Sequence, residues 1–334
     1  MTLKILEALK GKAQLDPKLI ALGDAHDERM LLAASLALKE GIARILLVGD
    51  RELVAQAAIK AAVDINTFDL FDPATADISE ISRVYYELKK AKLADEAAAR
   101  LEIMSNPLLA AALLARIGNV DGVLAGSLST TGEVIRAALK GIGTAPGVSV
   151  ISSMFLMCYP KLEGLREEFA LGFGDCAVMP DPTAEQLCDI ALSSALTYQT
   201  LTGDEPKVAM LSFSTKGSAQ NESTEKVIAA TALAKTRQPQ LKLDGELQFD
   251  AAFIPEIGIR KAKGSSVAGQ ANVFIFPNLD AGNIGYKIAE RLGMGQAIGP
   301  VLQGLARPMN DLSRGAAVSD ILNMIAITAL QAAA

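Results

Sequence analysis

The chain has 334 residues, of which half are hydrophobic, and it carries 32 lysines and arginines against 38 aspartates and glutamates. This apolar content excludes a disordered chain. The formal net charge of −6 argues against a nucleic-acid-binding protein, because neutralising phosphates requires a basic surface. The length exceeds what one hydrophobic core usually supports, so two domains are expected.

Few residues are available for metal or thiol chemistry. The three cysteines, Cys158, Cys176 and Cys188, form no Cys-x-x-Cys pair, and the single histidine, His26, cannot build a His-based triad or a multi-histidine metal site. We expect the cysteines to be small core residues and His26 to lie on the surface. The first twelve residues lack the apolar stretch of a secretory signal, and no apolar run reaches the roughly 20 residues of a membrane span. A cytoplasmic protein without membrane or nucleic-acid partners is expected.

Strand-like and helix-like segments alternate along the whole chain. Strands are expected at 19–22, 43–48, 122–125, 147–158, 207–213, 271–276 and 297–302. Helices are expected at 27–38, 53–62, 83–100, 107–117, 132–140, 186–200, 224–235, 282–292 and 319–333. This alternation predicts an α/β fold with mostly parallel sheets.

Two stretches rich in glycine and proline, 141–147 and 299–308, are the candidate crossings between domains. They predict a domain I made of residues 1–146 and 303–334 and a domain II made of residues 147–302. Each domain would be an α/β/α layer structure, and the last helix would pack back on domain I.

Four predicted strand-to-helix junctions are rich in glycine and small polar residues: 126–133, 212–219, 277–287 and 304–320. Ligands of open α/β sheets bind where strands end and helices begin, and each junction has a lysine or arginine within or beside it. This pattern favours an anionic ligand. Small polar residues also serve as ordinary turns and helix caps, so both interpretations remain open. None of the junctions fits a Walker loop or a dinucleotide fingerprint.

The last junction contains Ser313, Arg314 and Asp320 within eight residues. Asp320 is a possible proton acceptor, the planar guanidinium of Arg314 suits a phosphoryl group, and Ser313 can orient a neighbour. We expect a turn at 313–315 and a helix that starts near Val318 or Ser319. Asp320 would then lie in the first turn, where backbone N–H groups keep it ionised. The alternative is an ordinary helix start with Ser319 as its N-cap.

Several long blocks resemble the signatures of the phosphate acetyltransferase (phosphotransacetylase) family. They are Ser212-Phe-Ser-Thr-Lys-Gly-Ser-Ala219, Asp244-Gly-Glu-Leu-Gln-Phe-Asp-Ala251, 276–287, 299–306 and Asn310-Asp-Leu-Ser-Arg-Gly315, with weaker likeness at 27–29 and 126–146. The resemblance implies the reversible reaction acetyl-CoA + phosphate ⇌ acetyl phosphate + CoA. It also implies two α/β domains, similar to those of isocitrate and isopropylmalate dehydrogenases, with the active site in the interdomain cleft, and usually a homodimer.

The same resemblance assigns residues. Catalysis falls on Ser313, Arg314 and Asp320, and an arginine associated with CoA binding falls on Arg136. Lys89 stands where the family has another arginine, which keeps the charge but loses the bidentate donor fork. The matching loops add four candidate substrate-binding residues: Thr131, Ser214, Lys216 and Asn283. Ser129 stands near a histidine of many members, and this loop is more similar to the ethanolamine-utilisation type than to the acetate-kinase-linked type.

The expected mechanism is direct transfer in a ternary complex. Asp320, oriented by Ser313, takes the thiol proton of CoA, the sulfur attacks the acetyl carbonyl, and Arg314 holds the phosphate. This chemistry requires no metal or organic cofactor, since CoA is a substrate. Three alternatives remain: a phosphate butyryltransferase, a nicotinamide-dependent dehydrogenase, and a non-catalytic module that binds acyl phosphates or CoA.

Overall fold

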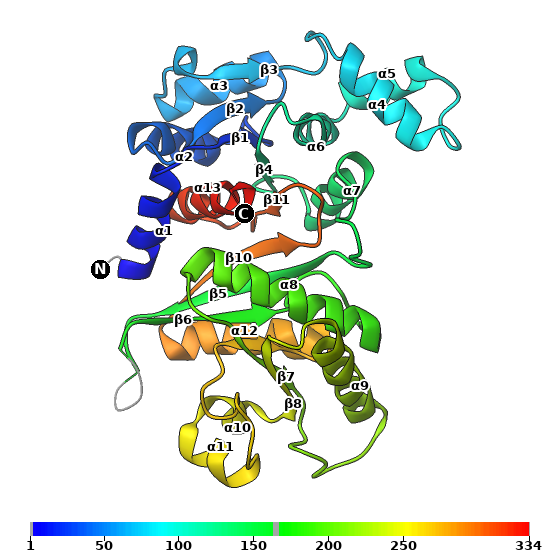
Figure 1. Ribbon diagram of the computed structural model, residues 1–334. Coiled ribbons are helices and arrows are strands. Elements are labelled where there is room, and N and C mark those ends of the chain that lie inside the picture. Colours follow the sequence, from blue (N-terminus) through cyan, green and yellow to red (C-terminus); the bar gives the residue numbers. More distant parts are fainter. Residues whose placement is uncertain (1–2, 163–166, 334) are drawn as a thin grey trace. The chain divides into compact units, whose positions relative to one another are not determined.

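The computed structural model describes residues 3–162 and 167–333, and the chain divides into two compact units. Unit 1 consists of Met1–Glu7 and Gly147–Gly304, and unit 2 of Ala8–Pro146 and Leu305–Ala334. Figure 1 shows their elements in colours that follow the sequence. The described residues 3–7 and residues 303–304 thus group with unit 1, although they were predicted to belong to domain I.

Unit 2 is built on a five-stranded sheet whose strands are all parallel, in the order β11-β4-β1-β2-β3. The strands are β1 (Leu19–Leu22), β2 (Arg44–Val48), β3 (Asp69–Phe71), β4 (Gly122–Ala125) and β11 (Met309–Asp311). The helices are α2 (Glu28–Lys39), α3 (Arg51–Ala61), α4 (Ser79–Lys89), α5 (Glu96–Met104), α6 (Pro107–Ile117), α7 (Thr131–Gly141) and α13 (Val318–Ala332), with a short 3-10 turn η1 (Ile65–Thr67). Helix α1 (Lys4–Gln14) runs across the sequence boundary between the units.

The two faces of this sheet bury different residues, because side chains alternate along a strand. On β1, Ala21 belongs to the core cluster that contains α6, while Ile20 lies on the face where Thr328 of α13 also packs. Helix α6 has local signals at both ends: Asn106 is its N-cap, Pro107 its first residue, and Gly118 its left-handed C-cap.

Unit 1 is built on a mixed six-stranded sheet in the order β10-β5-β6-β9-β7-β8. Strand β5 pairs antiparallel with β10 and β6, and the remaining pairs are parallel. The strands are β5 (Ser152–Tyr159), β6 (Phe169–Gly174), β7 (Lys207–Leu211), β8 (Lys242–Leu247), β9 (Val273–Ile275) and β10 (Gln296–Gln303). The helices are α8 (Ala184–Thr202), α9 (Glu222–Arg237), α10 (Phe249–Phe253), α11 (Pro255–Lys261) and α12 (Leu279–Gly293). Over the two units parallel pairs predominate, which confirms the predicted α/β class.

Strand β6 shows how unit 1 is layered. Leu171 and Phe173 point into an aromatic cluster that includes Phe253 and Phe274. The alternating glycines face α8: an added Cβ on Gly172 would lie 3.3 Å from the Tyr198 ring, and one on Gly174 would collide with Ser194. These small residues therefore let α8 pack closely on the sheet.

Several expectations are settled by the fold. The helix expected at 83–100 is wrong, since α4 ends at Lys89 and α5 begins at Glu96. The expected core position of the cysteines is confirmed, because all three are buried, and burial raises the pKa of Cys158 to about 12. His26 is exposed, as expected. No single helix among the described residues is long and apolar enough to cross a membrane, although α5 and α6, bent by 116° at their junction, would together pass on length and composition.

Candidate active site

The turn between β11 and α13 carries the three residues assigned to catalysis. The N–H of Ala316 donates to the carbonyl of Ser313 at 2.9 Å, which closes a turn, and α13 begins at Val318. The expected turn and helix start are therefore confirmed. Ser313, Arg314 and Asp320 are all exposed.

Asp320 lies in the first turn of α13, and its Oδ2 accepts a hydrogen bond from the N–H of Ala317 at 2.9 Å. Ala317 is the N-cap residue and has no capping side chain, so the alternative with Ser319 as N-cap is wrong. The Ser313 hydroxyl accepts from the N–H of Gly315 at 3.3 Å. Within the described residues Ser313 and Asp320 share no hydrogen bond, and orientation of Asp320 by Ser313 stays a prediction.

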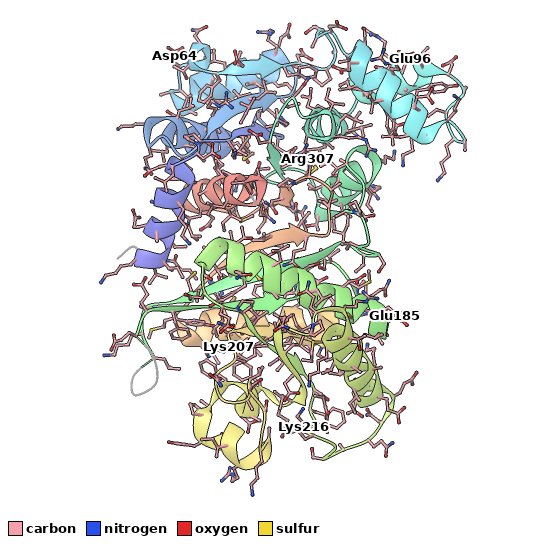
Figure 2. All side chains as sticks on the ribbon, in the orientation of Figure 1. Asp64, Glu96, Glu185, Lys207, Lys216 and Arg307 are labelled. Carbon is pink, nitrogen blue, oxygen red and sulfur yellow. The ribbon has the colours of Figure 1, made fainter. Side chains whose placement is uncertain are left out.

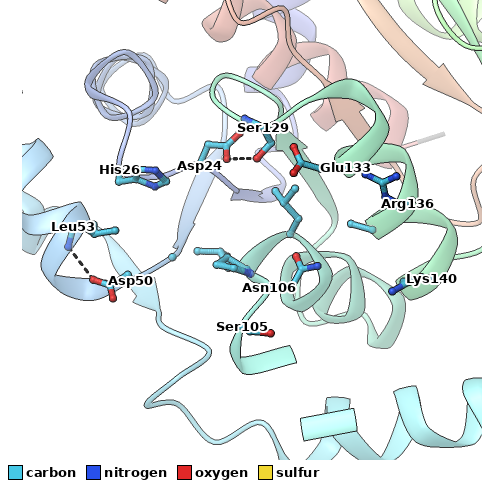
Figure 3. A pocket seen from close by; sticks show the side chains of 15 residues that line it. Asp24, His26, Asp50, Leu53, Ser105, Asn106, Ser129, Glu133, Arg136 and Lys140 are labelled. Carbon is cyan, nitrogen blue, oxygen red and sulfur yellow. Dashed lines mark hydrogen bonds between the residues drawn. The ribbon is translucent and has the colours of Figure 1, made fainter. Parts of the chain in front are cut away.

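The loop that follows β4 is fixed by a buried carboxylate, Asp24. Its Oδ2 accepts from the N–H groups of Gly126, Leu128 and Ser129 at 2.9 to 3.3 Å. Its Oδ1 accepts from the Ser129 hydroxyl at 2.6 Å, a bond that Figure 3 draws as a dashed line between the two side chains. Asp24 has a positive φ of 51°, a conformation that aspartate tolerates better than most residues. The residue near the family's histidine position, Ser129, is thus part of a rigid loop.

A second buried carboxylate, Asp311, lies two residues before Ser313. The Thr131 hydroxyl donates to its Oδ2 at 2.6 Å, and its Oδ1 has no hydrogen-bond partner among the described residues. Burial, with a smaller contribution from the charge of Asp24, raises the pKa of Asp311 to about 6. An added Cβ on Gly126 would collide with Asp311 and lie 2.7 Å from the Leu312 nitrogen, so only glycine fits there. Thr131 therefore contacts Asp311, and any substrate contact must share its hydroxyl.

Beside this loop, unit 2 contains a cavity of about 400 Å³. Figure 3 shows its lining, which includes His26, Asn106, Glu133, Arg136 and Lys140. Arg136 and Lys140 lie one turn apart on α7, and the exposed guanidinium of Arg136 makes no hydrogen bond or ion pair within the part of the chain that the structure describes. The cavity thus offers cationic groups on one wall.

Lys89 acts near the same wall of the cavity, because its charge influences Glu102, the partner of Lys140. The Lys140 ammonium pairs with Glu102, and the Tyr85 hydroxyl donates to Glu102 at 2.9 Å. Burial opposes ionisation of Glu102, yet these two bonds, with the charges of Lys140 and Lys89, lower its pKa. Lys89 is half-buried and lies close enough to Glu102 for its charge to help lower that pKa.

The three candidates in unit 1 make internal contacts. The Ser214 hydroxyl is buried and donates to Glu246 at 2.9 Å, and the Asn283 amide donates to the carbonyl of Cys176 at 3.0 Å. Lys216, labelled in Figure 2, places its ammonium 2.6 Å from Asp244 and 2.9 Å from the carbonyl of Gly245. Substrate binding by these residues stays a prediction and would have to share or replace these contacts.

Sequence reasoning missed the groups that hold the site together, among them Asp24, Asp311 and Lys140. A carboxylate placed before a helix gives no signal of the loop that it will bind a hundred residues later. Lys140 could have been found, because it lies four residues after Arg136 and so on the same helix face.

Unit 2 thus has two exposed guanidinium groups, that of Arg136 in the middle of α7 and that of Arg314 in the turn before α13, and an exposed carboxylate, Asp320, at the start of α13. This combination suits an α/β enzyme that binds phosphorylated substrates and moves a proton. Among the described residues no group of three or more His, Cys, Asp or Glu is placed to hold a metal ion.

Comparison with known proteins identifies the family within this class. Residues 4–329 match the family model described as "Phosphate acetyl/butaryl transferase", and the chain belongs to that family. It is 44% identical to the phosphate acetyltransferase of Acetivibrio thermocellus over 99% of this chain and 98% of the relative.

Solved structures agree. A phosphotransacetylase from Streptococcus pyogenes superposes with a TM-score of 0.92 at 39% identity, covering 100% of this chain and 99% of its own. The EutD phosphotransacetylase from Staphylococcus aureus superposes with a TM-score of 0.89 at 41% identity, covering 98% of each chain.

Proposed function

We propose that the protein is a phosphate acetyltransferase, which catalyses acetyl-CoA + phosphate ⇌ acetyl phosphate + CoA. The observation that carries this proposal is the turn with Ser313 and Arg314, followed directly by a helix whose first turn holds Asp320. This arrangement occurs in a chain that matches phosphate acetyltransferases along nearly its whole length.

Arg314 and Arg136 each bind a different anionic group of the substrates. Arg314 holds the phosphoryl group of acetyl phosphate, since a guanidinium binds phosphate oxygens bidentately. Arg136, with Lys140 beside it on the cavity wall, binds a phosphate of CoA. The positive charge of Lys89 also acts near this wall, since it helps to lower the pKa of Glu102, the partner of Lys140.

The transfer is direct. Asp320 accepts the proton of the CoA thiol as the sulfur attacks the acetyl carbonyl carbon, a carbon–sulfur bond forms, and the carbon–oxygen bond to phosphate breaks. The electron pair of that bond leaves with inorganic phosphate, whose charge Arg314 stabilises. A thiol and a carboxylate differ in pKa by several units, so full proton transfer before attack is unfavourable. The proton therefore moves as the carbon–sulfur bond forms, and Ser313 orients Asp320 once substrate is bound.

Three further properties belong to this proposal. The chemistry needs no metal or organic cofactor, because CoA is itself a substrate. A homodimer is supported by a stripe of exposed apolar residues on α12, where Ile284, Ile288 and Leu292 follow at four-residue spacing. A cytoplasmic location is supported by the three free cysteines, which are usual in reducing compartments.

The family description also names a butyryl substrate, so a phosphate butyryltransferase is the second candidate. Purified protein should be assayed with CoA and a series of acyl phosphates, following thioester formation by its ultraviolet absorbance. We expect the highest kcat/KM with acetyl phosphate. A higher value with butyryl phosphate would favour the second candidate, and no thioester with any acyl phosphate would contradict both.

A further inference from the structure

Arg29 lies in the first turn of α2, and every N–H group of its guanidinium donates to an acceptor within the protein. Its Nε donates to Asp27 Oδ1 at 3.1 Å, and one Nη2 hydrogen bond goes to Asp27 Oδ2 at 2.6 Å. The other three bonds go to carbonyl oxygens: Ser127 at 3.0 Å, Arg314 at 2.9 Å and Ala316 at 2.8 Å. A guanidinium has five N–H donors, and all five are therefore used.

The three carbonyls belong to the two segments that carry the candidate site. Arg314 and Ala316 lie in the turn before α13, and Ser127 lies in the loop after β4. One side chain thus joins the turn that presents Arg314 to the loop that leads into α7 and Arg136. These segments are 98 to 287 residues away from Arg29 in sequence.

Asp27 fixes the orientation of this guanidinium. The carboxylate is buried, caps α2 by accepting from the N–H of Arg29 at 2.9 Å, and forms a two-point pair with the Arg29 side chain. Burial opposes the charge of Asp27, but its hydrogen bonds with Arg29 keep its pKa below the usual range. The pair is therefore charged at neutral pH, and a planar fork held at two points can aim its remaining donors in one direction only.

We propose that Arg29 is a positioning residue for acyl transfer, which fixes the turn of Ser313 and Arg314 and the start of α13. Arg29 does not contact substrate, because it has no donor left to offer. The inference rests on the proposed function, and it gives a role to the block 27–29, to which the family resemblance attaches none. An error of about 1 Å in the placement of a catalytic group can cost on the order of a hundredfold in rate.

The test is a double-mutant cycle. Arg29→Gln should lower kcat/KM for acetyl phosphate by about tenfold to a hundredfold in the wild-type background. In an Arg314→Ala background the same change should cost less than in the wild type, since the misplaced turn no longer carries its arginine and only Ser313 and Asp320 remain to be misplaced. Arg29→Lys should resemble Arg29→Gln, because an ammonium has only three donors and cannot reach the five acceptor atoms that the guanidinium binds. Arg44→Gln, an exposed arginine of the same unit, is the control.

Two additions keep the test decisive. Arg29→Gln leaves Asp27 as an unpaired buried charge and could fail to fold, so Asp27→Asn/Arg29→Gln is made as well, since asparagine caps a helix as well as aspartate does. Hydrogen–deuterium exchange of each Arg29 variant should be faster than in the wild type at 312–320 and 126–130 and unchanged in unit 1, whereas Arg44→Gln should match the wild type throughout.

The outcomes separate the two proposals. Equal losses in both backgrounds, activity within about threefold of wild type in every Arg29 variant, or unchanged exchange at 312–320 would overturn the positioning role. If the wild-type protein forms no thioester at all, the proposed function fails, and the exchange measurement alone decides whether Arg29 holds the turn.

Discussion

The glycine-rich junctions of the two units look alike in sequence but differ in how their cations are used. In unit 1 the ammonium of Lys216 is bound to Asp244 and to a backbone carbonyl, and the neighbouring Ser214 hydroxyl is bound to Glu246. In unit 2 the side chains of Arg136 and Arg314 make no hydrogen bond or ion pair within the described ranges 3–162 and 167–333. The second arrangement leaves positive charge exposed for a ligand.

The difference lies in the carboxylates. In unit 2 the carboxylates near the loops are hydrogen-bonded to other groups: Asp24 to backbone N–H groups, Asp27 to Arg29, Asp311 to Thr131 and Glu133 to Thr130. The hydrogen bonds from Thr130 lower the pKa of Glu133 most, and the charges of Arg136 and Arg314 make only a smaller contribution. In unit 1 Asp244 is engaged by the lysines themselves, Lys216 and Lys235. A cation in a glycine-rich loop therefore indicates a binding site only when nearby carboxylates already have partners.

The largest effects should come from the turn and helix start in unit 2. Arg314→Ala and Asp320→Asn should each lower kcat by about a hundredfold or more, because one removes charge stabilisation and the other the proton acceptor. Steady-state thioester formation measures both. Near-wild-type turnover of either variant would remove that residue from the mechanism.

A smaller and more selective effect is expected at the cavity wall. Arg136→Ala should raise the KM for CoA by about tenfold and change the KM for acetyl phosphate less, because Arg136 lines the cavity, whose lining includes neither Ser313 nor Arg314. Varying each substrate at saturating levels of the other separates the two constants. Equal increases in both would mean that Arg136 does not distinguish the substrates.

Local signals made part of this fold predictable from sequence. The strand Gly122–Ala125 and the helix Pro107–Ile117 were predicted to the residue, since an apolar run, a proline and a glycine mark their limits. The break between α4 and α5 was missed, because the Ala- and Leu-rich segment keeps helical composition across 90–95. Strand β8 (Lys242–Leu247) was missed because its charged residues and its glycine obscure a strand at the edge of the sheet.

The candidate site was likewise predictable only in part. The turn at 313–315 and the position of Asp320 follow from spacing along a single segment. The contacts of Asp24, Arg29 and Asp311 could not be predicted, because they join segments that lie about a hundred residues or more apart. Such contacts depend on the strand order of the sheet, which no local pattern specifies.

Stability should depend on pH through Asp311. Its folded-state pKa of about 6 lies above the ordinary 3.8, so the folded protein holds this proton more tightly than the unfolded chain. This contribution is complete below the ordinary pKa and is lost as pH rises through about 6, by about 3 kcal/mol at most. Asp311→Asn should flatten the rise in unfolding free energy on acidification from pH 6 to 4, measured by urea denaturation. An unchanged slope would mean that Asp311 is ionised in the folded state.

The opposite dependence of stability on pH, with the smallest effect on turnover, is expected for Asp244 in unit 1. Burial opposes ionisation of Asp244, but Lys216 and Lys235 lower its pKa to about 2. Its contribution, about 2 kcal/mol, is present above the ordinary pKa of 3.8 and is lost as pH falls through about 2. Asp244→Asn should therefore lower stability at neutral pH, measured by urea denaturation, while kcat changes by less than about threefold. A large fall in kcat would place this pair in the reaction.

The most direct measurement compares Arg314→Ala with Lys216→Met in one assay of thioester formation from acetyl phosphate and CoA. We predict that kcat falls by about a hundredfold in Arg314→Ala and by less than about tenfold in Lys216→Met. A larger fall in Lys216→Met than in Arg314→Ala would contradict the assignment of the chemistry to the turn before α13.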